Sequence, residues 1–299
     1  LMVARALARG GKRIILLEAR NRAGGRIDVL PESEFGYAAE AGAEFVHGAA
    51  HHTRDVMREA GLSLTVLDGT GWQAENGVLS SSQRVTPNAD EFRRELIALK
   101  QDLPVAEFLA RHFGDPRYAE LRYAITRMVE GYDAADPSRA STFALREEWM
   151  GRGLGQQGRI AEGYGPLIAF LLDDCRRLGV AVYWGAVVTS IDAAQAKVTV
   201  RCRDGRFFAA DAAILTVPLP LLGSIALPEA AKDVAAAAIA DIGFGNVVKI
   251  LLRFSSNWWA ARTSPDMSFL FSRAAVPTWW TQHPDVHPVL TGWLAGPRA

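Results

Sequence analysis

The hydrophobic and polar residues of the chain alternate between helical and strand-like spacing, and their order predicts an α/β protein. Apolar residues recur at helical spacing over 1–9, and a short apolar run predicts a buried strand over 12–19. Helical periodicity over 88–130 should be divided into several helices by Pro104 and Pro116. The other predicted elements are helices over 51–60, 163–177 and 229–240, and strands over 62–67, 72–79, 180–184, 187–200, 207–217 and 246–254.

The end of the first predicted strand has the pattern of a dinucleotide site. The apolar run stops at Glu18, whose carboxylate could accept hydrogen bonds from both hydroxyls of a ribose. Gly24 and Gly25 would let the backbone approach a pyrophosphate, and Arg20 and Arg26 would neutralise it. The alternatives are a solvated surface acid and an ordinary basic loop with a glycine turn.

The position of the first predicted helix indicates that a preceding segment is missing. In a dinucleotide-binding βαβ unit, a strand and the turn G-x-G-x-x-G come directly before this helix. The chain starts inside the helix, and it ends in 291–299 without a closing element, so we expect a fragment truncated at both ends. The alternative is that 1–9 is an ordinary amphipathic first helix and nothing precedes it.

Composition and charge narrow the classes of partner and compartment. A length of 299 residues fits one large domain or two intertwined ones, and a net charge of zero gives no general attraction to nucleic acid or anionic membranes. The longest apolar stretch, 212–227, is broken by Pro218 and Pro220 and is too short to span a bilayer. Two cysteines, Cys175 and Cys202, fit a reducing compartment. We therefore expect a cytoplasmic protein without nucleic-acid or membrane partners.

Three histidines close in sequence raise the question of a metal site. His47 and His51 stand four residues apart, and His52 follows. Acidic or cysteine partners at ligand spacing are missing from this segment, so we predict no metal site.

Five blocks in order along essentially the whole chain carry a family resemblance. They are LEAR at 17–20 with GGR at 24–26, EAGAEFVHG at 40–48, GYG at 163–165, AILTVPLPLL at 213–222, and GFGNVVKI at 243–250 followed by Phe254, Trp258 and Trp259. With these blocks the chain resembles the FAD-dependent amine oxidases of the monoamine oxidase, polyamine oxidase and histone-demethylase type. The family also has an N-terminal glycine-rich turn and a C-terminal flavin-contacting segment, which this sequence does not include.

The resemblance implies an α/β fold of two discontinuous domains. A Rossmann-like FAD-binding domain would comprise 1–75 and 160–225, without its N-terminal glycine-rich turn. A mixed α+β substrate-binding domain would comprise 76–159 and 226–299, without its C-terminal part.

The resemblance also assigns contacts with the cofactor. Gly42, Ala43, Glu44 and Phe45 would pass along the flavin ring, where small residues let a planar ring lie against backbone. The other residues predicted to bind FAD are Glu18, Ala19, Arg20, Gly24, Gly25, Arg26, Val188, Thr216 and Pro218. From the residues alone, 42–45 could equally be a tight core loop, Val188 part of a plain buried strand, and Pro218 the end of a strand. FAD should be non-covalent, because neither cysteine lies in a segment assigned to the flavin ring.

Lys249 is the residue with the strongest individual signal. It lies in the middle of an apolar predicted strand, and a buried cation is costly unless it is paired or its pKa is lowered. In the family the matching lysine holds a water against N5 of the flavin, so we predict a catalytic role. The alternative is a lysine on an edge strand that points to solvent.

The implied reaction is oxidation of a carbon–nitrogen bond in a small amine. The amine gives a hydride to N5 of FAD, the imine is hydrolysed, and molecular oxygen reoxidises the flavin and yields hydrogen peroxide. Tryptophans near the end of the chain could hold an amine cation over their faces or form the core of a sheet; they are Trp258, Trp259, Trp279, Trp280 and Trp293. Three alternatives stay open: a related FAD enzyme acting on a C–C bond, a non-catalytic remnant of the fold, and an NAD-dependent dehydrogenase.

Overall fold

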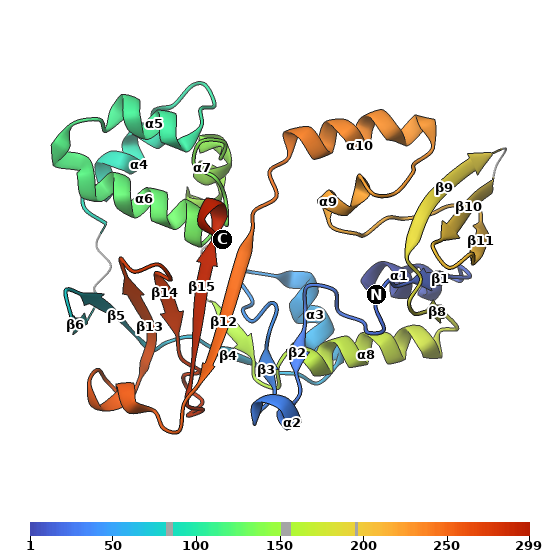
Figure 1. Cartoon of the computed structure of the whole chain (residues 1–299), viewed down its shortest axis with the longest axis horizontal. Coiled ribbons are helices and arrows are strands. Elements are labelled where there is room, and N and C mark those ends of the chain that lie inside the picture. Colours follow the sequence, from blue (N-terminus) through green and yellow to red (C-terminus); the bar gives the residue numbers. More distant parts are fainter. Residues whose placement is uncertain (82–85, 151–156, 195–196) are drawn as a thin grey trace. The chain divides into compact units, whose positions relative to one another are not determined.

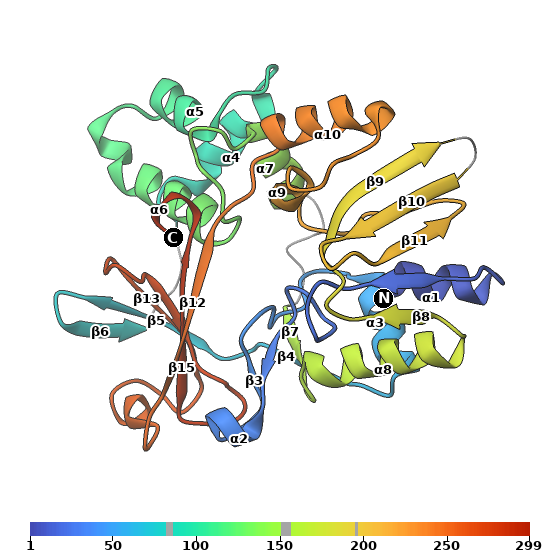
Figure 2. The ribbon, with the colours of Figure 1, turned by 45° about the vertical axis from the view of Figure 1, so that its right-hand side comes forward.

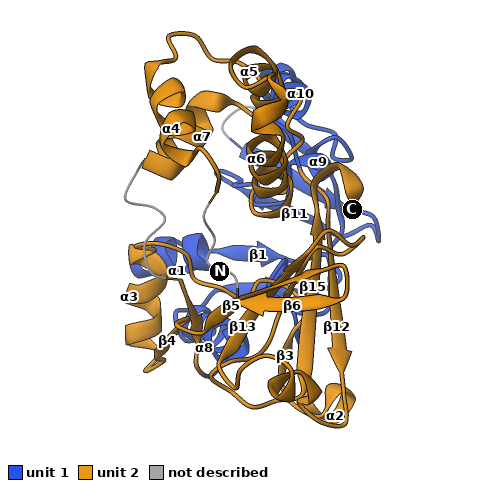
Figure 3. Cartoon of the chain, turned by 90° about the vertical axis from the view of Figure 1, so that its left-hand side faces the viewer, with its two compact units in different colours: residues 1–29, 162–244 blue, residues 30–161, 245–299 orange. Residues whose placement is uncertain are grey.

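The computed structural model describes residues 1–81, 86–150, 157–194 and 197–299 (Figure 1). The chain forms two compact units, each built from two segments (Figure 3). Unit 1 comprises Leu1–Val29 and Glu162–Phe244, and unit 2 comprises Leu30–Ala161 and Gly245–Ala299. Helices combined with parallel and antiparallel strands confirm the predicted α/β fold class.

The first part of unit 1 is a parallel strand pair with two helices that pack on each other (Figure 2). Helix α1 (Met2–Arg9) lies against α8 (Tyr164–Arg177), and the buried Cys175 belongs to their shared core. Strand β1 (Ile15–Leu17) runs parallel to β8 (Ala181–Tyr183), as expected for strands joined through a long crossover. The predicted helix at the start and the predicted strand before Glu18 are therefore both present.

The second part of unit 1 is an antiparallel meander followed by two helices. Its strands, in the sheet order β11-β10-β9, are β9 (Val188–Ala194), β10 (Lys197–Cys202) and β11 (Phe207–Ala210). Prolines open the helices that follow, because proline fits the first positions of a helix; these are α9 (Leu219–Leu222) and α10 (Glu229–Asp241).

Two predicted strands of the meander had the wrong extent. The strand expected over 207–217 ends at Ala210, and Ile214 is 62% exposed. A strand needs a hydrogen-bonding neighbour, and no strand in the described part of the chain pairs with 212–217. The strand expected over 187–200 is instead two strands, β9 and β10, on either side of 195–196, which lie outside the described residues.

Unit 2 is built on a six-stranded mixed sheet with the order β12-β15-β14-β13-β5-β6. The strands are β5 (Thr70–Glu75), β6 (Val78–Ser81), β12 (Val247–Arg253), β13 (Met267–Ser272), β14 (Thr278–Trp280) and β15 (Val289–Ala295). Only the β13–β5 pair is parallel within this sheet as described. Strand β12, which contains Lys249, lies at one edge of the sheet.

A helical layer forms the second part of unit 2. It contains α4 (Ala89–Ala98), α5 (Val105–His112), α6 (Ala119–Gly131) and α7 (Thr142–Met150). Pro104 caps α5, and Pro116 opens a short 3-10 turn before α6, which confirms both predicted helix breaks. The helices share an aromatic and aliphatic core that includes Phe92, Leu96, Phe108, Phe113 and Leu121.

Short elements complete the chain. They are β2 (Val29–Leu30), α2 (Glu32–Phe35), β3 (Ala39–Glu40), α3 (His51–Glu59), β4 (Leu64–Val66), β7 (Gly158–Ile160) and the 3-10 turns Trp258–Ala261 and Gly296–Arg298. In unit 2, β4 pairs antiparallel with β7. Among the described residues, no helix has the length and apolar character needed to cross a bilayer.

Candidate functional site

Glu18 lies directly after β1 in unit 1 and is fixed by backbone hydrogen bonds. Its N–H donates to the carbonyl of Tyr183 over 3.0 Å, and its own carbonyl accepts from the N–H of Ala186. Among the residues that the structure describes, its half-buried carboxylate accepts one hydrogen bond, from the backbone N–H of Arg20 at 2.8 Å. An ionised carboxylate has capacity for several more donors, so Glu18 fits the role of a ribose ligand. Ala19 next to it is exposed.

The glycine turn after Glu18 depends on both of its glycines. Gly24 has a φ of +109° and Gly25 a φ of +60°, which are values that residues with a side chain rarely adopt. A Cβ at Gly24 would lie 2.5 Å from the carbonyl oxygen of Ile27, whereas a Cβ at Gly25 would meet nothing within 4 Å. Gly24 is therefore required by the turn itself, and Gly25 leaves open space over the backbone.

One arginine of this turn stabilises the turn itself, and two others are exposed and could bind a pyrophosphate. Arg22, which the sequence analysis did not single out, donates to the carbonyls of Ile27 and Gly25 and pairs with Asp28 at 2.7 Å. Arg26 is exposed and forms no ion pair with any described residue. Arg20 is exposed too, and its guanidinium lies 3.5 Å from the Gly25 carbonyl. Arg20 and Arg26 thus keep the charge that a pyrophosphate requires.

Three other predicted cofactor residues of unit 1 lie farther along the chain. Val188 begins β9 and is paired with Cys202 of β10. Thr216 is exposed in the segment without a strand, and Pro218 caps α9. Their role in cofactor binding stays a prediction.

The segment Gly42 to Phe45 in unit 2 points its glutamate inward. Ala43 is exposed, Glu44 is buried, and the ring of Phe45 lies 5.3 Å from the ring of Trp280. The Arg159 guanidinium covers the Phe45 ring at 4.9 Å. The family resemblance predicts that this segment passes along the flavin ring, but it does not predict these side-chain contacts.

Lys249 is buried although its strand is an edge strand, so it does not point to solvent. Its side chain is 7% exposed, and its Nζ lies 2.8 Å from Oε2 of Glu44. The same Nζ donates to the carbonyls of Glu40 and Gly42 at 2.5 and 3.0 Å. Lys249 is also 5.7 Å from the centre of the Trp280 ring. The structure therefore joins two predicted site elements, Lys249 and the 42–45 segment.

A pair of carboxyl groups, Asp133 and Glu148, was missed by the sequence analysis. Burial raises the pKa of Asp133 to about 7, with further contributions from the charge of Glu148 and a hydrogen bond to it. The pKa of the neighbouring Tyr132 is raised by burial and then by the same two acids. Partial burial lowers the pKa of His47, whose Nδ1 lies 3.4 Å from the Tyr132 hydroxyl. The acids are 15 residues apart and share no motif, so only the fold brings them together.

Aromatic rings and a backbone contact connect the acid pair with the lysine strand. The ring of Phe45 is 6.0 Å from that of His47, which is 5.5 Å from the ring of Tyr132. Trp293 pairs with Lys249 in the register of β12 and β15, and its Nε1 donates to the carbonyl of Gly131 over 2.7 Å.

Gly245, two residues before β12, lets the backbone approach the loop that follows α6 and contains Asp133 and Ala134. A Cβ there would lie 1.7 Å from the carbonyl oxygen of Ala134, directly after Asp133. Any side chain at this position would push the loop away from the segment that leads into β12. Of the two glycines in the predicted GFGNVVKI block, Gly245 is therefore required by packing.

The tryptophans of the chain end fall into different surroundings. Trp280 and Trp293 lie 6.0 Å apart, beside Lys249. Trp258 and Trp259 form an edge-to-face cluster with Phe254, and Trp279 packs in the same apolar core as Trp259. Of the predicted set, only Trp280 and Trp293 adjoin the candidate site.

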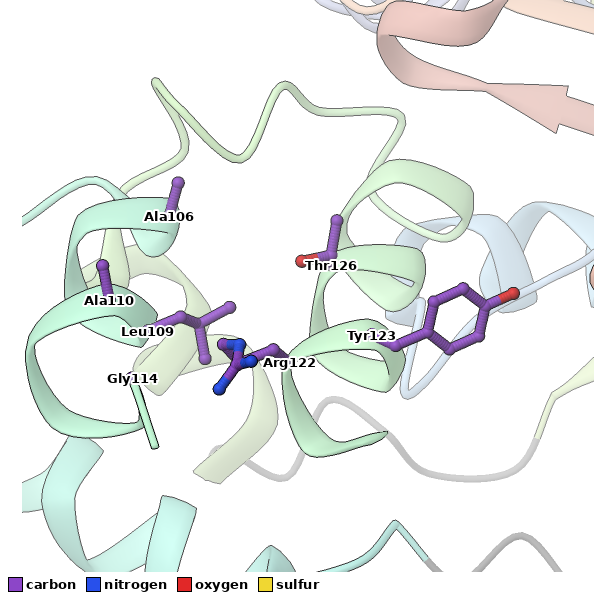
Figure 4. Close-up of a pocket in the computed structure, with 7 residues that line it drawn as sticks. All are labelled: Ala106, Leu109, Ala110, Gly114, Arg122, Tyr123 and Thr126. Atoms are coloured by element: carbon purple, nitrogen blue, oxygen red, sulfur yellow. The ribbon is translucent and has the colours of Figure 1, made fainter. Parts of the chain in front are cut away.

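A shallow groove on the helical layer offers no comparable chemistry (Figure 4). Its volume is about 490 Å³, and it lies between α5 and α6. In Figure 4, Leu109 and Arg122 point into the groove, whereas Tyr123 points away from it. The Arg122 guanidinium donates to the carbonyls of Phe113 and Asp115, so it supports the local fold. The described residues also contain no group of three or more His, Cys, Asp or Glu side chains arranged to hold a metal ion.

Comparison with known proteins identifies the family. The sequence model of flavin-containing amine oxidoreductases matches residues 1–299. Polyamine oxidase 5 of Oryza sativa subsp. japonica is 27% identical over 290 residues, which cover 86% of this chain and 56% of that protein. Polyamine oxidase 2 of Arabidopsis thaliana is 27% identical over 298 residues, which cover 89% of this chain and 58% of that protein.

A solved structure shares the fold. Cyclohexylamine oxidase from Brevibacterium oxydans superposes with a TM-score of 0.78 at 20% identity, covering 99% of this chain and 72% of that one. The chain spans less than three fifths of the length of the two polyamine oxidases, at 56% and 58%. The match over all 299 residues nevertheless shows that the chain belongs to the family of flavin-containing amine oxidoreductases.

Proposed function

We propose that the chain is part of a flavin-dependent oxidase of amines with more than one ammonium group. The observation that carries this proposal is the Asp133–Glu148 carboxyl pair, joined by a row of aromatic contacts to the Lys249 strand. Asp133 and Glu148 are half-buried, carboxylates in such positions attract cations strongly, and aromatic faces attract ammonium groups. Similarity to polyamine oxidases supports the same substrate class.

The cofactor proposed is non-covalent FAD, and the residues of unit 1 fit it. Glu18 has free acceptor capacity for ribose hydroxyls, the backbone at Gly25 is open, and Arg26 is available for the pyrophosphate. When bound, FAD would supply the redox chemistry for oxidising the amine, with oxygen as the proposed final electron acceptor and hydrogen peroxide as the product. Unit 1 is thus proposed as the cofactor-binding part, and unit 2 as the substrate-binding part.

The chain's own residues bind and orient the amine. The acid pair would hold a distal ammonium group by charge-assisted hydrogen bonds. His47, with a lowered pKa, stays neutral at pH 7 and does not repel that ammonium. The rings of Phe45 and Trp280 would restrict the position of the reacting carbon beside Lys249. A related enzyme acting on a C–C bond of an apolar substrate would gain nothing from this acid pair, so the amine is favoured.

Steady-state kinetics on the flavin-loaded protein test this assignment. E148Q should lower kcat/KM for spermidine about 10- to 100-fold, the loss expected for one charge-assisted contact, and leave propylamine nearly unchanged. The control is E147Q, which changes the neighbouring exposed glutamate of α7 and should have no effect. Equal losses with both amines, or equal effects of E147Q and E148Q, would contradict the proposed substrate class.

A further inference from the structure

The Lys249 ammonium donates its three hydrogen bonds to one short segment, residues 40–44. Its acceptors are the carbonyl of Glu40 at 2.5 Å, the carbonyl of Gly42 at 3.0 Å and the Oε2 of Glu44 at 2.8 Å. These acceptors are two residues apart along the chain, in the segment where the backbone bends directly after β3. An ammonium has three N–H donors, so this set uses all of them.

The Glu44 carboxylate holds a second buried cation as well. Its Oε2 accepts from Lys249 and from Nε1 of Trp280 at 2.9 Å, and its Oε1 accepts from Nε of Arg159 at 2.9 Å. The side chain of Glu44 is 4% exposed and that of Arg159 is 12% exposed. Gln282 adds a contact of 3.4 Å.

Arg159 is itself bound to the chain by further carbonyls, at 2.9 Å from His283 and at 2.8 Å from Thr281. The guanidinium therefore keeps its place without depending on Glu44 alone. Lys249, in contrast, has Glu44 as its only carboxylate partner in the described part of the chain. Two cations share one anion, and the group carries a net charge of about +1.

We propose that Glu44 is a positioning residue that holds the Lys249 ammonium on the Glu40–Glu44 segment and makes Lys249 a fixed positive charge. Lys249 can take up a water only by giving up one of its three present bonds. The contact also fixes the 42–45 segment, because the ammonium bridges its backbone and its glutamate. The role of that charge beside a flavin rests on the proposed function, whereas the contact is a property of unit 2 alone.

Amine acylation with acetic anhydride, read by mass spectrometry, tests the contact without cofactor or substrate. The chain has five lysines, of which Lys12, Lys100, Lys197 and Lys232 are exposed and serve as internal references. Only an unprotonated amine within reach of solvent reacts, so Lys249 should react at least about 10-fold more slowly than Lys232 in the unmodified protein. E44Q should remove most of that protection, and E44D should restore part of it.

A matched variant separates charge from packing. W280F removes a different hydrogen bond from the same oxygen of Glu44 and changes no charge, so Lys249 should stay protected. Equal labelling of Lys249 in W280F and E44Q would overturn the proposal, because packing alone would then explain the protection. Labelling of Lys249 as fast as Lys232 in the unmodified protein would overturn it too.

Thermal unfolding keeps the proposal testable if E44Q folds poorly. E44Q leaves Lys249 without its carboxylate, and breaking a buried ion pair should lower Tm by about 6 °C or more. The double variant E44Q/K249M removes the stranded cation and should regain a large part of that loss. If the loss of Tm in the double variant equals the sum of the losses in E44Q and K249M, the two residues are not coupled and the proposal fails. Neither measurement involves FAD, so a failure here is distinct from a failure of the proposed oxidase activity.

Discussion

Asp133, two residues after α6, and Glu148, in α7, form a hydrogen-bonded pair of carboxyl groups. Because burial and the charge of Glu148 raise the pKa of Asp133 to about 7, the pair changes its charge near neutral pH. Asp133 is therefore mostly protonated below that pH and carries a negative charge above it. A site of this kind binds a dication more strongly as the pH rises through 7.

The first prediction concerns this pH dependence. KM for spermidine should fall about 10-fold as the pH rises across 7, since one more charge-assisted contact becomes available. The ratio of KM values for spermidine and propylamine is the quantity to measure, because it cancels the deprotonation of the reacting amine that both substrates share. In D133N the ratio should be independent of pH; a ratio in D133N that still changes near pH 7 would assign the effect to another group.

The second prediction concerns the ion pair that fastens α1 to α8. Nε of Arg5 lies 2.5 Å from Oδ2 of Asp174, and both side chains are at least 90% buried. D174N should lower the free energy of unfolding by about 3 kcal/mol, because it strands a buried guanidinium. Its control is D173N, which breaks the exposed pair with Arg176 and should cost less than about 1 kcal/mol. Chemical denaturation measures both, and equal costs would show that Arg5 and Asp174 are not coupled.

The same pair predicts part of the acid sensitivity of the fold. The hydrogen bond from Arg5, followed by the charges of Arg5, Arg9 and Arg177, lowers the pKa of Asp174 below its ordinary value. A carboxyl with a lowered pKa in the folded state contributes stability above its unfolded pKa of about 4, and loses it as the pH falls through the folded value. Stability of D174N should therefore change less than that of the unmodified protein below about pH 4.

The third prediction separates the two arginines of the glycine turn. R26A should weaken FAD binding about 10-fold or more and leave Tm unchanged, because Arg26 is exposed and without an ion pair among the described residues. R22A should lower Tm, because Arg22 holds the carbonyls of Gly25 and Ile27 together with Asp28. Fluorescence titration with FAD and thermal unfolding of both variants provide the comparison. A loss of FAD affinity in R22A alone would reverse the assignment.

The sequence predicts those features that depend on the chemistry or backbone conformation of a single residue type. An acid at the end of a short apolar run placed Glu18 after β1, and paired glycines predicted the turn that follows. Lys249 was conspicuous because it interrupts an apolar strand, and its burial agrees with that signal. Pro104 and Pro116 marked helix boundaries, because proline lacks the N–H that a helix interior requires.

The remaining features depend on contacts between distant segments. Asp133 and Glu148 are ordinary acids in their local sequence, and only the fold brings the residue after α6 next to the glutamate of α7. The sequence also could not distinguish Arg22 from Arg26, since turn geometry decides which guanidinium folds over the loop. For Glu44, the family resemblance indicated proximity to a flavin but not a side chain bound to Lys249 and Arg159.

The most direct test of flavin-dependent amine oxidation is the visible absorption spectrum of the protein after incubation with FAD, desalting and anaerobic addition of spermidine. A flavin band should survive desalting and be bleached by spermidine, and E148Q should slow the bleaching while E147Q should not. A retained flavin that no amine bleaches would contradict the proposed amine oxidation.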